Sequence, residues 1–511
     1  YIIQKLFSTD KPCAARRTTE GDSVVCVCND DYCDEITREP VTQTSFYAYT
    51  SNKVWYSLTI KRPKKTTAYL KPLWRLTKLD PDTTFQEVIG FGGAVTDAVG
   101  IHWTNLSETL RNYFISSYFG EKGIEYNIIR VPIGGSDFST HAYAYNELPE
   151  NDTFLSNFSL TYEDEVYKIP LIKAMINIAP TPVNVVATTW SPPIWMKTNH
   201  DYYGFSRLKT EYYQTYADYH YKFLEKYADQ GIKVWAISTT NEPVNGVVPI
   251  ARFNSLGWTP KEMGIWITEN LGPTIKNSTF RDIKILAVDD QRYSIPLWFN
   301  VMVENYPKAL DYIDGVAVHF YGDFITPASI LSDVGRNFPG KFVIATEACE
   351  GSYPWQFKKV VLGSWSRART YVMDILEDLN HDVVGWIDWN MALDIKGGPN
   401  WSGNHVDSPV IVFAENKEFV KQPMFYVMGH FSKFIPRGSK RIATTETTGL
   451  FSSSVQNVAF ITPRKTIVVV LYNDGGARSV GIKLGQRLMK INMDADSITT
   501  LELPYDNTCN M

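Results

Sequence analysis

The sequence predicts an α/β protein, a (β/α)8 TIM barrel with an accessory all-β domain built from both chain ends. Eight short runs of apolar and β-branched residues recur between residues 86 and 388, and the segments between them are long enough for helices. Continuous apolar runs of this length are typical of parallel strands that are buried on both faces. Both ends of the chain instead alternate between apolar and polar residues, a pattern typical of antiparallel strands.

The eight runs are expected to be the barrel strands, in chain order: residues 86–91, 126–131, 183–188, 233–238, 283–288, 315–319, 341–345 and 382–387. Helices are expected between them, for example at residues 108–119, 211–229 and 261–271. The alternative is an open doubly wound sheet, which usually has fewer strands and a G-x-G-x-x-G first turn. The first turn here reads G-F-G-G-A-V, so the closed barrel is favoured.

The two ends are each too short to form a sandwich comfortably alone, so we expect them to pair beside the barrel. Alternating stretches occur at residues 53–60, 454–461 and 466–473. The expected division is a small disulfide-bearing antiparallel β subdomain (1–38 plus 391–422), a β-sandwich domain (39–84 plus 438–511) and the catalytic barrel (85–390 plus 423–437).

Composition excludes several classes of function. The chain has 511 residues, of which 44% are hydrophobic and 21% are charged, as in soluble globular proteins. Its formal net charge is −5, and no strongly basic run occurs, so nucleic-acid binding is not expected. No apolar run reaches 18 residues, so a transmembrane helix is not expected either. The sequence indicates no cofactor and no metal ion.

Four cysteines lie close together near the start of the chain, namely Cys13, Cys26, Cys28 and Cys33. Such a cluster forms either a zinc site or two disulfides. The C-V-C-N-D-D-Y-C spacing lacks the paired C-x-x-C motifs of a zinc ribbon, which favours disulfides. N-x-S/T motifs agree with an oxidising compartment of the secretory pathway; they occur at Asn105, Asn151, Asn157, Asn277 and Asn400. Glycosylation is expected at Asn105, Asn151, Asn157 and Asn277.

Two glutamates follow predicted strands at the same face of the barrel. Glu242 lies in T-T-N-E-P after the fourth strand, and Glu347 lies in T-E-A-C after the seventh. Barrel enzymes carry their catalytic groups at the C-terminal ends of the strands. Cleavage of a glycosidic bond needs two carboxyl groups, which lie about 5 Å apart in retaining enzymes. One glutamate at a strand end is ordinarily a solvated loop residue, but two at one rim indicate this chemistry.

Other strand ends are also polar or aromatic. Arg130 ends the second strand, and Asp137 follows shortly after it. The residues after the third, sixth and eighth strands include Trp190, Tyr321 and Trp389. Each alone is more simply explained by packing, but together they describe a rim that can bind hydroxyl groups and stack on a sugar ring.

Several longer motifs carry a family resemblance: F-G-G-A-V-T-D-A at 91–98, Y-N-I-I-R-V-P at 126–132, W-S-P-P-I-W-M-K-T-N at 190–199, A-T-E-A-C at 345–349 and K-Q-P-M-F-Y-V-M-G-H-F-S-K-F-I-P at 421–436. With G-G-P-N-W and V-D-S-P between 397 and 409, they resemble the lysosomal acid β-glucosidases (glucocerebrosidases) of glycoside hydrolase family 30. The resemblance spans essentially the whole chain.

The resemblance implies hydrolysis of glucosylceramide to glucose and ceramide with net retention, through a covalent glucosyl-enzyme intermediate. It implies Glu242 as the acid/base and Glu347 as the nucleophile. It also implies a saposin-type activator protein, an anionic phospholipid membrane surface and a place in the lysosomal lumen, peripheral to the membrane. The cysteine motif implies the disulfides Cys13–Cys26 and Cys28–Cys33.

The same resemblance implies the residues that bind substrate. Those around the sugar are Asp137, Trp190, Asn241, Trp389 and Asn404. Arg130 and Tyr321 match residues on the nucleophile's side, and Phe253 matches an aromatic residue at the aglycone mouth.

Departures from the family pattern concern the entrance of the site. Residues 244–252 keep little of the pattern, and residues 352–357 carry roughly a one-residue insertion. The alternative function is therefore a family 30 glycosidase that acts on soluble β-glucosides, xylosides or glucans. A different class is a non-catalytic carbohydrate- or lipid-binding protein on an enzyme fold. Trp355 and Phe357 are candidates for contact with a membrane, unless they pack on neighbouring helices.

Overall fold

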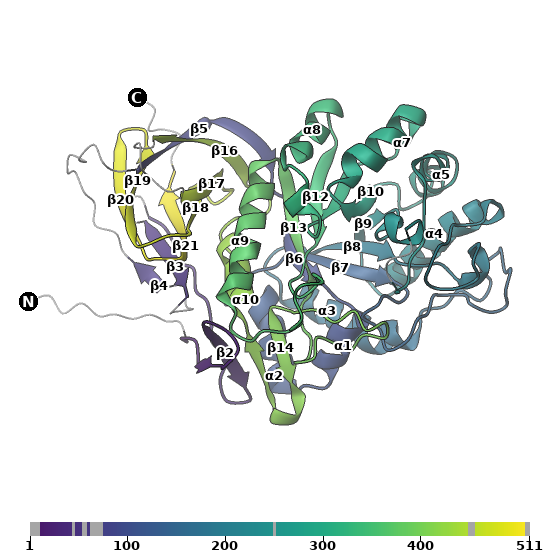
Figure 1. Cartoon of the computed structure of the whole chain (residues 1–511), viewed down its shortest axis with the longest axis horizontal. Helices are drawn as coiled ribbons and strands as arrows, with labels where there is room; N and C mark the ends of the chain where they lie inside the picture. Colours follow the sequence, from purple (N-terminus) through teal and green to yellow (C-terminus); the bar gives the residue numbers. More distant parts are fainter. Residues whose placement is uncertain are drawn as a thin grey trace, which may run out of the picture.

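A computed structural model of the chain describes residues 11–42, 46–53, 59–61, 75–248, 252–447 and 455–505. Eight parallel strands close into a barrel, and two further sheets, one of four strands and one of nine, lie beside it (Figure 1). The predicted fold class, a (β/α)8 barrel with accessory β structure, is confirmed.

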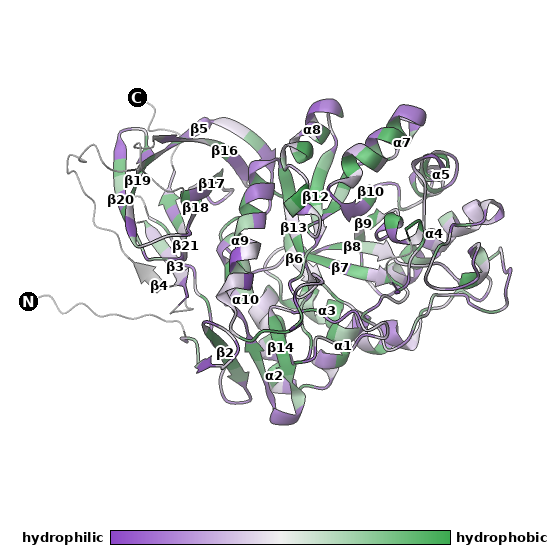
Figure 2. Ribbon diagram, viewed as in Figure 1, coloured by the Kyte–Doolittle hydropathy of each residue, from purple (hydrophilic) through white to green (hydrophobic). Residues whose placement is uncertain are grey.

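The barrel strands pair in the order β10-β11-β12-β13-β6-β7-β8-β9, and β9 closes onto β10. Their residues are mostly apolar (Figure 2), as burial on both faces requires. Their bounds are β6 Gly90–Ala94, β7 Ile128–Ile133, β8 Asn184–Thr189, β9 Val234–Ser238, β10 Lys284–Gln291, β11 Gly315–His319, β12 Phe342–Glu347 and β13 Val383–Asn390.

The first barrel strand was predicted at residues 86–91, which overlap the observed strand only at Gly90 and Phe91. The structure ends β5, Arg75–Glu87, in the accessory sheet and begins β6 at Gly90. Glycine is required in β6 because a Cβ at Gly92 would lie 2.0 Å from the backbone oxygen of Ile128 in β7. Because β6 is rich in glycine, a search for β-branched residues does not detect it. The other seven predicted strands overlap observed ones.

Helices connect the strands and cover the outside of the barrel. The predicted helix at 108–119 is α2, which Ser107 caps by accepting a hydrogen bond from the backbone N–H of Leu110. The predicted helix at 261–271 continues further, through a π-helical turn (Ile267–Leu271), into α6. The bounds are α1 Asp97–Thr104, α2 Glu108–Phe119, α3 Ile169–Ile178, α4 Tyr213–Asp229, α5 Pro260–Trp266, α6 Gly272–Lys276, α7 Asn300–Asn305, α8 Ser329–Asn337, α9 Trp365–Asn380 and α10 Pro423–Ser432.

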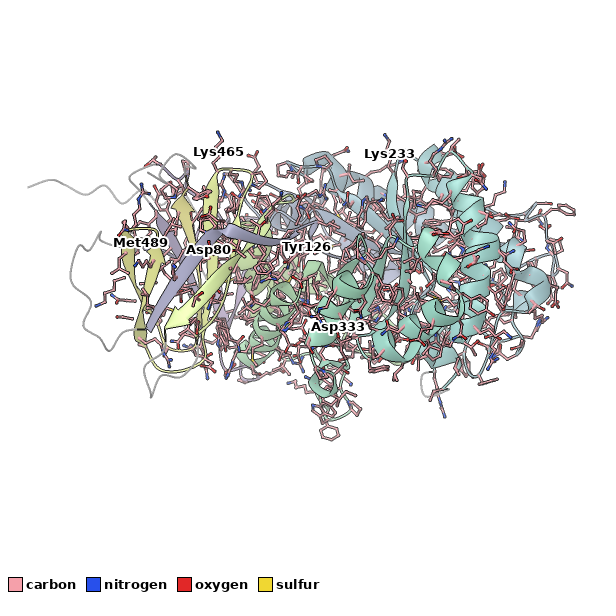
Figure 3. The ribbon with its side chains drawn as sticks, turned by 90° about the horizontal axis from the view of Figure 1, so that it is seen from above. Asp80, Tyr126, Lys233, Asp333, Lys465 and Met489 are labelled. Carbon is pink, nitrogen blue, oxygen red and sulfur yellow. A yellow bond between two sulfur atoms is a disulfide. The ribbon has the colours of Figure 1, made fainter. Side chains whose placement is uncertain are left out.

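The nine-stranded sheet combines both ends of the chain, as expected, because β3 pairs with β21 and β5 pairs with β16. Figure 3 shows it from above beside the barrel, with Asp80 and Met489 in the sheet and Asp333 in the barrel. Residues 54–58 of the predicted strand 53–60 lie outside the described residues. The bounds are β3 Tyr47–Asn52, β4 Thr59–Lys61, β5 Arg75–Glu87, β16 Lys440–Thr447, β17 Val455–Ile461, β18 Thr466–Asn473, β19 Arg478–Leu484, β20 Arg487–Met493 and β21 Ser497–Pro504.

The four-stranded sheet has the order β1-β2-β15-β14. Its strands are β1 Ala15–Arg17, β2 Val24–Asn29, β14 Val410–Phe413 and β15 Glu418–Lys421. The predicted disulfides Cys13–Cys26 and Cys28–Cys33 are both present, and they tie β2 to its flanking segments. Cys349 is buried with a free thiol, and Cys509 lies outside the described residues. The finer domain boundaries stay a prediction. Of the described helices, none is long and apolar enough to cross a membrane.

Candidate active site

A cavity of about 570 Å³ opens at the C-terminal ends of the barrel strands. All of the predicted site residues except Arg130 line it: Glu242, Glu347, Asp137, Trp190, Asn241, Phe253, Tyr321, Trp389 and Asn404. Arg130, the third residue of β7, lies fully buried and reaches Glu347 with its guanidinium group. The structure therefore brings together residues that are far apart in sequence.

Glu242 and Glu347 face each other across this cavity. Glu347 is the last residue of β12, and Glu242 follows β9 in a left-handed backbone conformation with φ of 43°. A carboxylate oxygen of each lies within 4.8 Å of the other. This separation is close to that of a retaining pair, and it leaves too little room for a water molecule placed as in inverting enzymes.

Arg130 and Tyr321 both donate hydrogen bonds to Glu347. The guanidinium group of Arg130 binds one carboxylate oxygen, and the Tyr321 hydroxyl donates to the other at 2.9 Å. Burial raises the pKa of Glu347. The charges of His319 and Arg130 reduce this rise, because they stabilise the carboxylate. The two donors also fix the direction in which the carboxylate oxygens point.

Glu242 accepts hydrogen bonds from three side chains that sequence reasoning missed. Gln291 and His319 donate to its Oε1 at 2.8 and 3.0 Å, and Asn245 donates to its Oε2 at 2.6 Å. His319 ends β11, so the same search of strand ends could have found it. Gln291 lies beyond the apolar run that marked its strand, and Asn245 lies in the segment that departs from the family pattern.

His319 and Arg130 are the cations of the site, and buried Asp289 joins them. His319 Nε2 lies 3.1 Å from Asp289 Oδ1, and Arg130 lies 3.0 Å from Asp289 Oδ2. Burial alone lowers the pKa of His319, but Glu347 and the two carboxylates bonded to its ring outweigh burial and raise it to about 10. Burial disfavours ionised Asp289, yet Arg130 and His319 hold its pKa far below the usual range.

Glu242, His319 and Glu347 offer ligand atoms within 4.8 Å of one another, which is close enough for a metal ion. The chemistry of the set argues against such an ion. His319 already donates to Glu242, and Arg130 already donates to Glu347. The two side chains thus place positive charge where a metal would place it.

The lining of the cavity also carries aromatic rings and hydrogen-bonding groups. Trp190 and Trp389 stack with ring centroids 5.3 Å apart, and Arg130 lies over the Trp190 ring at 4.9 Å. Asp137 accepts hydrogen bonds from Asn404 and Asn400 at 2.9 and 3.3 Å. Burial raises the pKa of Asp137 to about 7. Flat apolar faces beside amides and a carboxyl group are suited to a sugar ring and its hydroxyl groups.

Apolar side chains surround the mouth of the cavity. Trp355 stacks on Tyr353 with centroids 4.7 Å apart and keeps 59% of its surface exposed. Phe357 is 91% exposed, so it does not pack on neighbouring helices. Phe324 and Ile325 are about two-thirds exposed, at 67% and 65%. Phe324, Ile325 and Trp355 line the cavity and form the apolar mouth of the site, and Phe357 lies two residues beyond Trp355 in the chain.

The predicted glycosylation sites Asn105, Asn151, Asn157 and Asn277 are all exposed. Asn400 is half-buried, and its amide donates to Asp137. A glycan on Asn400 would therefore disturb the cavity wall, whereas the other four positions leave room for one. Glycosylation at those four positions stays a prediction.

Comparison with known proteins decides the family. Residues 88–435 match the glycosyl hydrolase family 30 TIM-barrel domain. The chain belongs to glycoside hydrolase family 30. Residues 438–501 match the beta sandwich domain of the same family. The predicted resemblance and the prediction of a glycoside hydrolase are both confirmed, and the reading as a binding protein without catalysis is not supported.

Two family 30 relatives match over most of their length. Lysosomal acid glucosylceramidase of Mus musculus is 42% identical over 88% of this chain and 87% of its own. Putative glucosylceramidase 3 of Caenorhabditis elegans is 41% identical over 88% of this chain and 86% of its own. Among solved structures, SrfJ from Salmonella typhimurium superposes with a TM-score of 0.81 at 25% identity, covering 91% of this chain and all of that chain.

Proposed function

We propose that this family 30 glycoside hydrolase cleaves glucosylceramide to glucose and ceramide by a retaining double displacement. The observation that carries the mechanism is the pair of carboxylates, Glu242 and Glu347, with oxygens within 4.8 Å at one end of the barrel. The substrate is proposed because relatives named as glucosylceramidases match with 42% and 41% identity, whereas the fungal endo-1,6-β-D-glucanase of Trichoderma harzianum matches with 26%.

In the first step, Glu347 attacks the anomeric carbon and forms a covalent glucosyl-enzyme. Glu242 donates its proton to the ceramide oxygen as the glycosidic bond breaks, so ceramide leaves as a neutral alcohol. Arg130 and Tyr321 hold the attacking carboxylate in place. The positive charges of Arg130 and His319 favour the ionised nucleophile.

In the second step, Glu242 acts as the base. It removes a proton from a water molecule that attacks the anomeric carbon, and Glu347 is the leaving group. His319 donates to Glu242 Oε1 and so helps to fix the direction in which this carboxyl group points. Two inversions at the same carbon give net retention.

We further propose that the enzyme works in the lysosomal lumen at an anionic phospholipid surface, with help from a saposin-type activator protein. The relative from Mus musculus is named lysosomal, and the disulfides suit an oxidising pathway. Ceramide stays in a membrane, so the active site must approach that surface. The apolar mouth and the exposed side chain of Phe357 support such contact.

The proposed function is tested by hydrolysis of a fluorogenic β-glucoside and of glucosylceramide in anionic liposomes at about pH 5. Glu347→Gln should abolish both activities, because an amide cannot act as this nucleophile. Glu269→Gln, at an exposed position of the outer helices, is the matched control and should keep both. Turnover of the soluble glucoside alone would indicate that the substrate is a soluble glycoside. Full activity of Glu347→Gln would contradict the assignment of Glu347 as the nucleophile.

Membrane contact is tested with the double variant Trp355→Ser and Phe357→Ser. Cosedimentation with phosphatidylserine liposomes should fall severalfold, because two exposed aromatic side chains leave the bilayer interface. Phe154→Ser removes a side chain of similar exposure, 87%, that lies far in sequence from Trp355 and Phe357. It should bind like the wild type. Undiminished binding of the double variant would contradict the role of the apolar mouth.

A further inference from the structure

Lys168 is a buried lysine that takes no part in the chemistry proposed above. It ends the π-helical turn Glu163–Lys168, which leads into α3, and it is 0% exposed. Its ammonium group lies 3.0 Å from a carboxylate oxygen of Asp164 and 3.7 Å from one of Asp97, the first residue of α1. A fully buried lysine is rare and costs stability unless its charge is compensated, so its position asks for an explanation.

The ammonium group of Lys168 also binds the chain where it leaves β7. It donates to the backbone carbonyl oxygen of Gly134 at 3.2 Å and to the hydroxyl group of Tyr143 at 3.4 Å. The backbone N–H of Gly135 donates to the carbonyl oxygen of Tyr143 at 3.1 Å, which closes the chain between them into a loop. Lys168 therefore contacts both ends of this loop, residues 134–143.

Asp97 binds the middle of the same loop. Its Oδ2 accepts hydrogen bonds from the hydroxyl groups of Ser139 and Tyr143, at 2.6 and 2.9 Å. The Oγ of Ser139 in turn accepts a hydrogen bond from the backbone N–H of Ser136 at 3.1 Å. All four residues are buried. Because the carboxylate of Asp97 and the amide of Ser136 meet at one hydroxyl group, the turn formed by residues 136–139 is fixed relative to α1.

Asp137 lies inside this turn, and its side chain lines the active-site cavity. There its carboxyl group accepts hydrogen bonds from two asparagine amides. Asp97, Ser139 and Lys168 are described residues outside the lining of this cavity. They are therefore placed to support Asp137 from behind rather than to touch a sugar themselves.

We propose that Asp97, Lys168 and Ser139 are positioning residues that aim the carboxyl group of Asp137 at the sugar ring of the substrate. Ser139 connects the turn to Asp97, and Lys168 compensates the buried Asp97 carboxylate and holds the loop closed. A displacement of about 1 Å at a substrate contact can lower the rate on the order of 100-fold, so such support matters for catalysis. The proposal rests on the proposed function, because it takes Asp137 as a sugar-binding residue.

The functional test is a double-mutant cycle on kcat/KM for a fluorogenic β-glucoside at about pH 5. Ser139→Ala removes the hydroxyl group that joins Asp97 to the turn, and it should lower kcat/KM by about tenfold or more. In the Asp137→Ala background no carboxyl group remains to be aimed, so the same substitution should lower kcat/KM further by less than about twofold. Equal losses in both backgrounds would overturn the proposal.

Lys168→Met removes the buried charge and should behave as Ser139→Ala does in both backgrounds; if it does not fold, Ser139→Ala decides alone. Tyr227→Phe is the matched control, because the Tyr227 hydroxyl donates to Asp164 at 2.8 Å in the same buried network but comes from α4. It should keep kcat/KM within about twofold, even where its melting temperature falls as far as that of Ser139→Ala. An equal loss of activity in both variants would indicate general destabilisation and would also overturn the proposal.

Hydrogen exchange of the backbone amides of residues 134–140 in the full chain tests the positioning without relying on activity. In Ser139→Ala the amide of Ser136 loses its acceptor, so exchange in this stretch should accelerate on the order of tenfold. Tyr227→Phe should leave it within about twofold of the wild type. Unchanged exchange in Ser139→Ala would contradict the role of Ser139. If the wild type hydrolyses no β-glucoside at all, the proposed function fails, and hydrogen exchange alone then decides whether Asp97 and Ser139 hold the turn.

Discussion

At the scale of single residues, Arg130 connects the groups of the candidate active site. Its guanidinium group donates to Glu347, Asn241 and Asp289 while it lies over the Trp190 ring. A lysine could not serve these acceptors in the same plane, because its ammonium group is a compact charge without the planar fork of arginine. Together with His319, Arg130 therefore supplies positive charge that compensates the buried carboxylates.

His319 offers a direct test of this charge balance. His319→Asn should shift both limbs of the bell-shaped pH profile of kcat/KM to higher pH by about one unit, because removing a cation raises the pKa of a nearby carboxyl group. His141→Asn changes a histidine that is 57% exposed and should leave the profile in place. A variant with lower kcat but an unshifted profile would show that His319 has only a structural role.

At the scale of elements, the close packing of β6 against β7 depends on Gly92. Gly92→Ala should lower the free energy of unfolding by about 1–3 kcal/mol, because the new methyl group would meet the backbone of Ile128 and the strands would have to move apart. Gly476→Ala is a suitable control, since a Cβ there has nothing within 4 Å. Urea unfolding followed by tryptophan fluorescence measures both. Equal stability of the two variants would contradict the packing described.

The elements also explain what could be predicted from the sequence. Strand ends of a parallel barrel converge on one face, so Glu242, Glu347 and Arg130 could be placed together without a structure. The position of Gln291 could not be predicted, because β10 continues beyond its apolar run. The strand is irregular at Val288 and Asp289, which adopt positive φ, and no sequence pattern signals such an irregularity. The approach of Asp323 to Asp374 and Asp378 of α9 could not be predicted either, because α9 meets the turn at Asp323 only in the folded chain.

At the scale of the whole molecule, buried titratable groups predict a preference for acidic conditions. Asp137 and Asp290 have pKa values of about 7, whereas an aspartate in the unfolded chain titrates near 3.9. Between these values the folded protein binds more protons than the unfolded chain, so stability falls as pH rises. His319 has a pKa of about 10 in the folded protein and about 6.5 in the unfolded chain, so it adds to this loss of stability from about pH 6.5 upward. Asp289 acts in the opposite direction below about pH 4, His220 and His430 do so below about pH 6.5, and Lys197 does so from about pH 7 upward.

We therefore expect the melting temperature to be higher at pH 5 than at pH 8, by roughly 5 °C or more. Differential scanning fluorimetry in buffers of equal ionic strength measures it. Asp290→Asn should reduce the difference, because one of the groups that loses a proton is then absent. A melting temperature that rises from pH 5 to pH 8 would contradict these pKa shifts.

The most direct test of a retaining mechanism on Glu347 is to trap its covalent intermediate. A 2-deoxy-2-fluoro-β-glucosyl fluoride should react with the full-length protein at about pH 5, and digestion with peptide mass mapping then locates the label. We expect one glucosyl label on Glu347 and none in Glu347→Gln. A label on another residue, or hydrolysis of β-glucosides by an enzyme that never acquires a label, would contradict the assignment of Glu347 as the nucleophile.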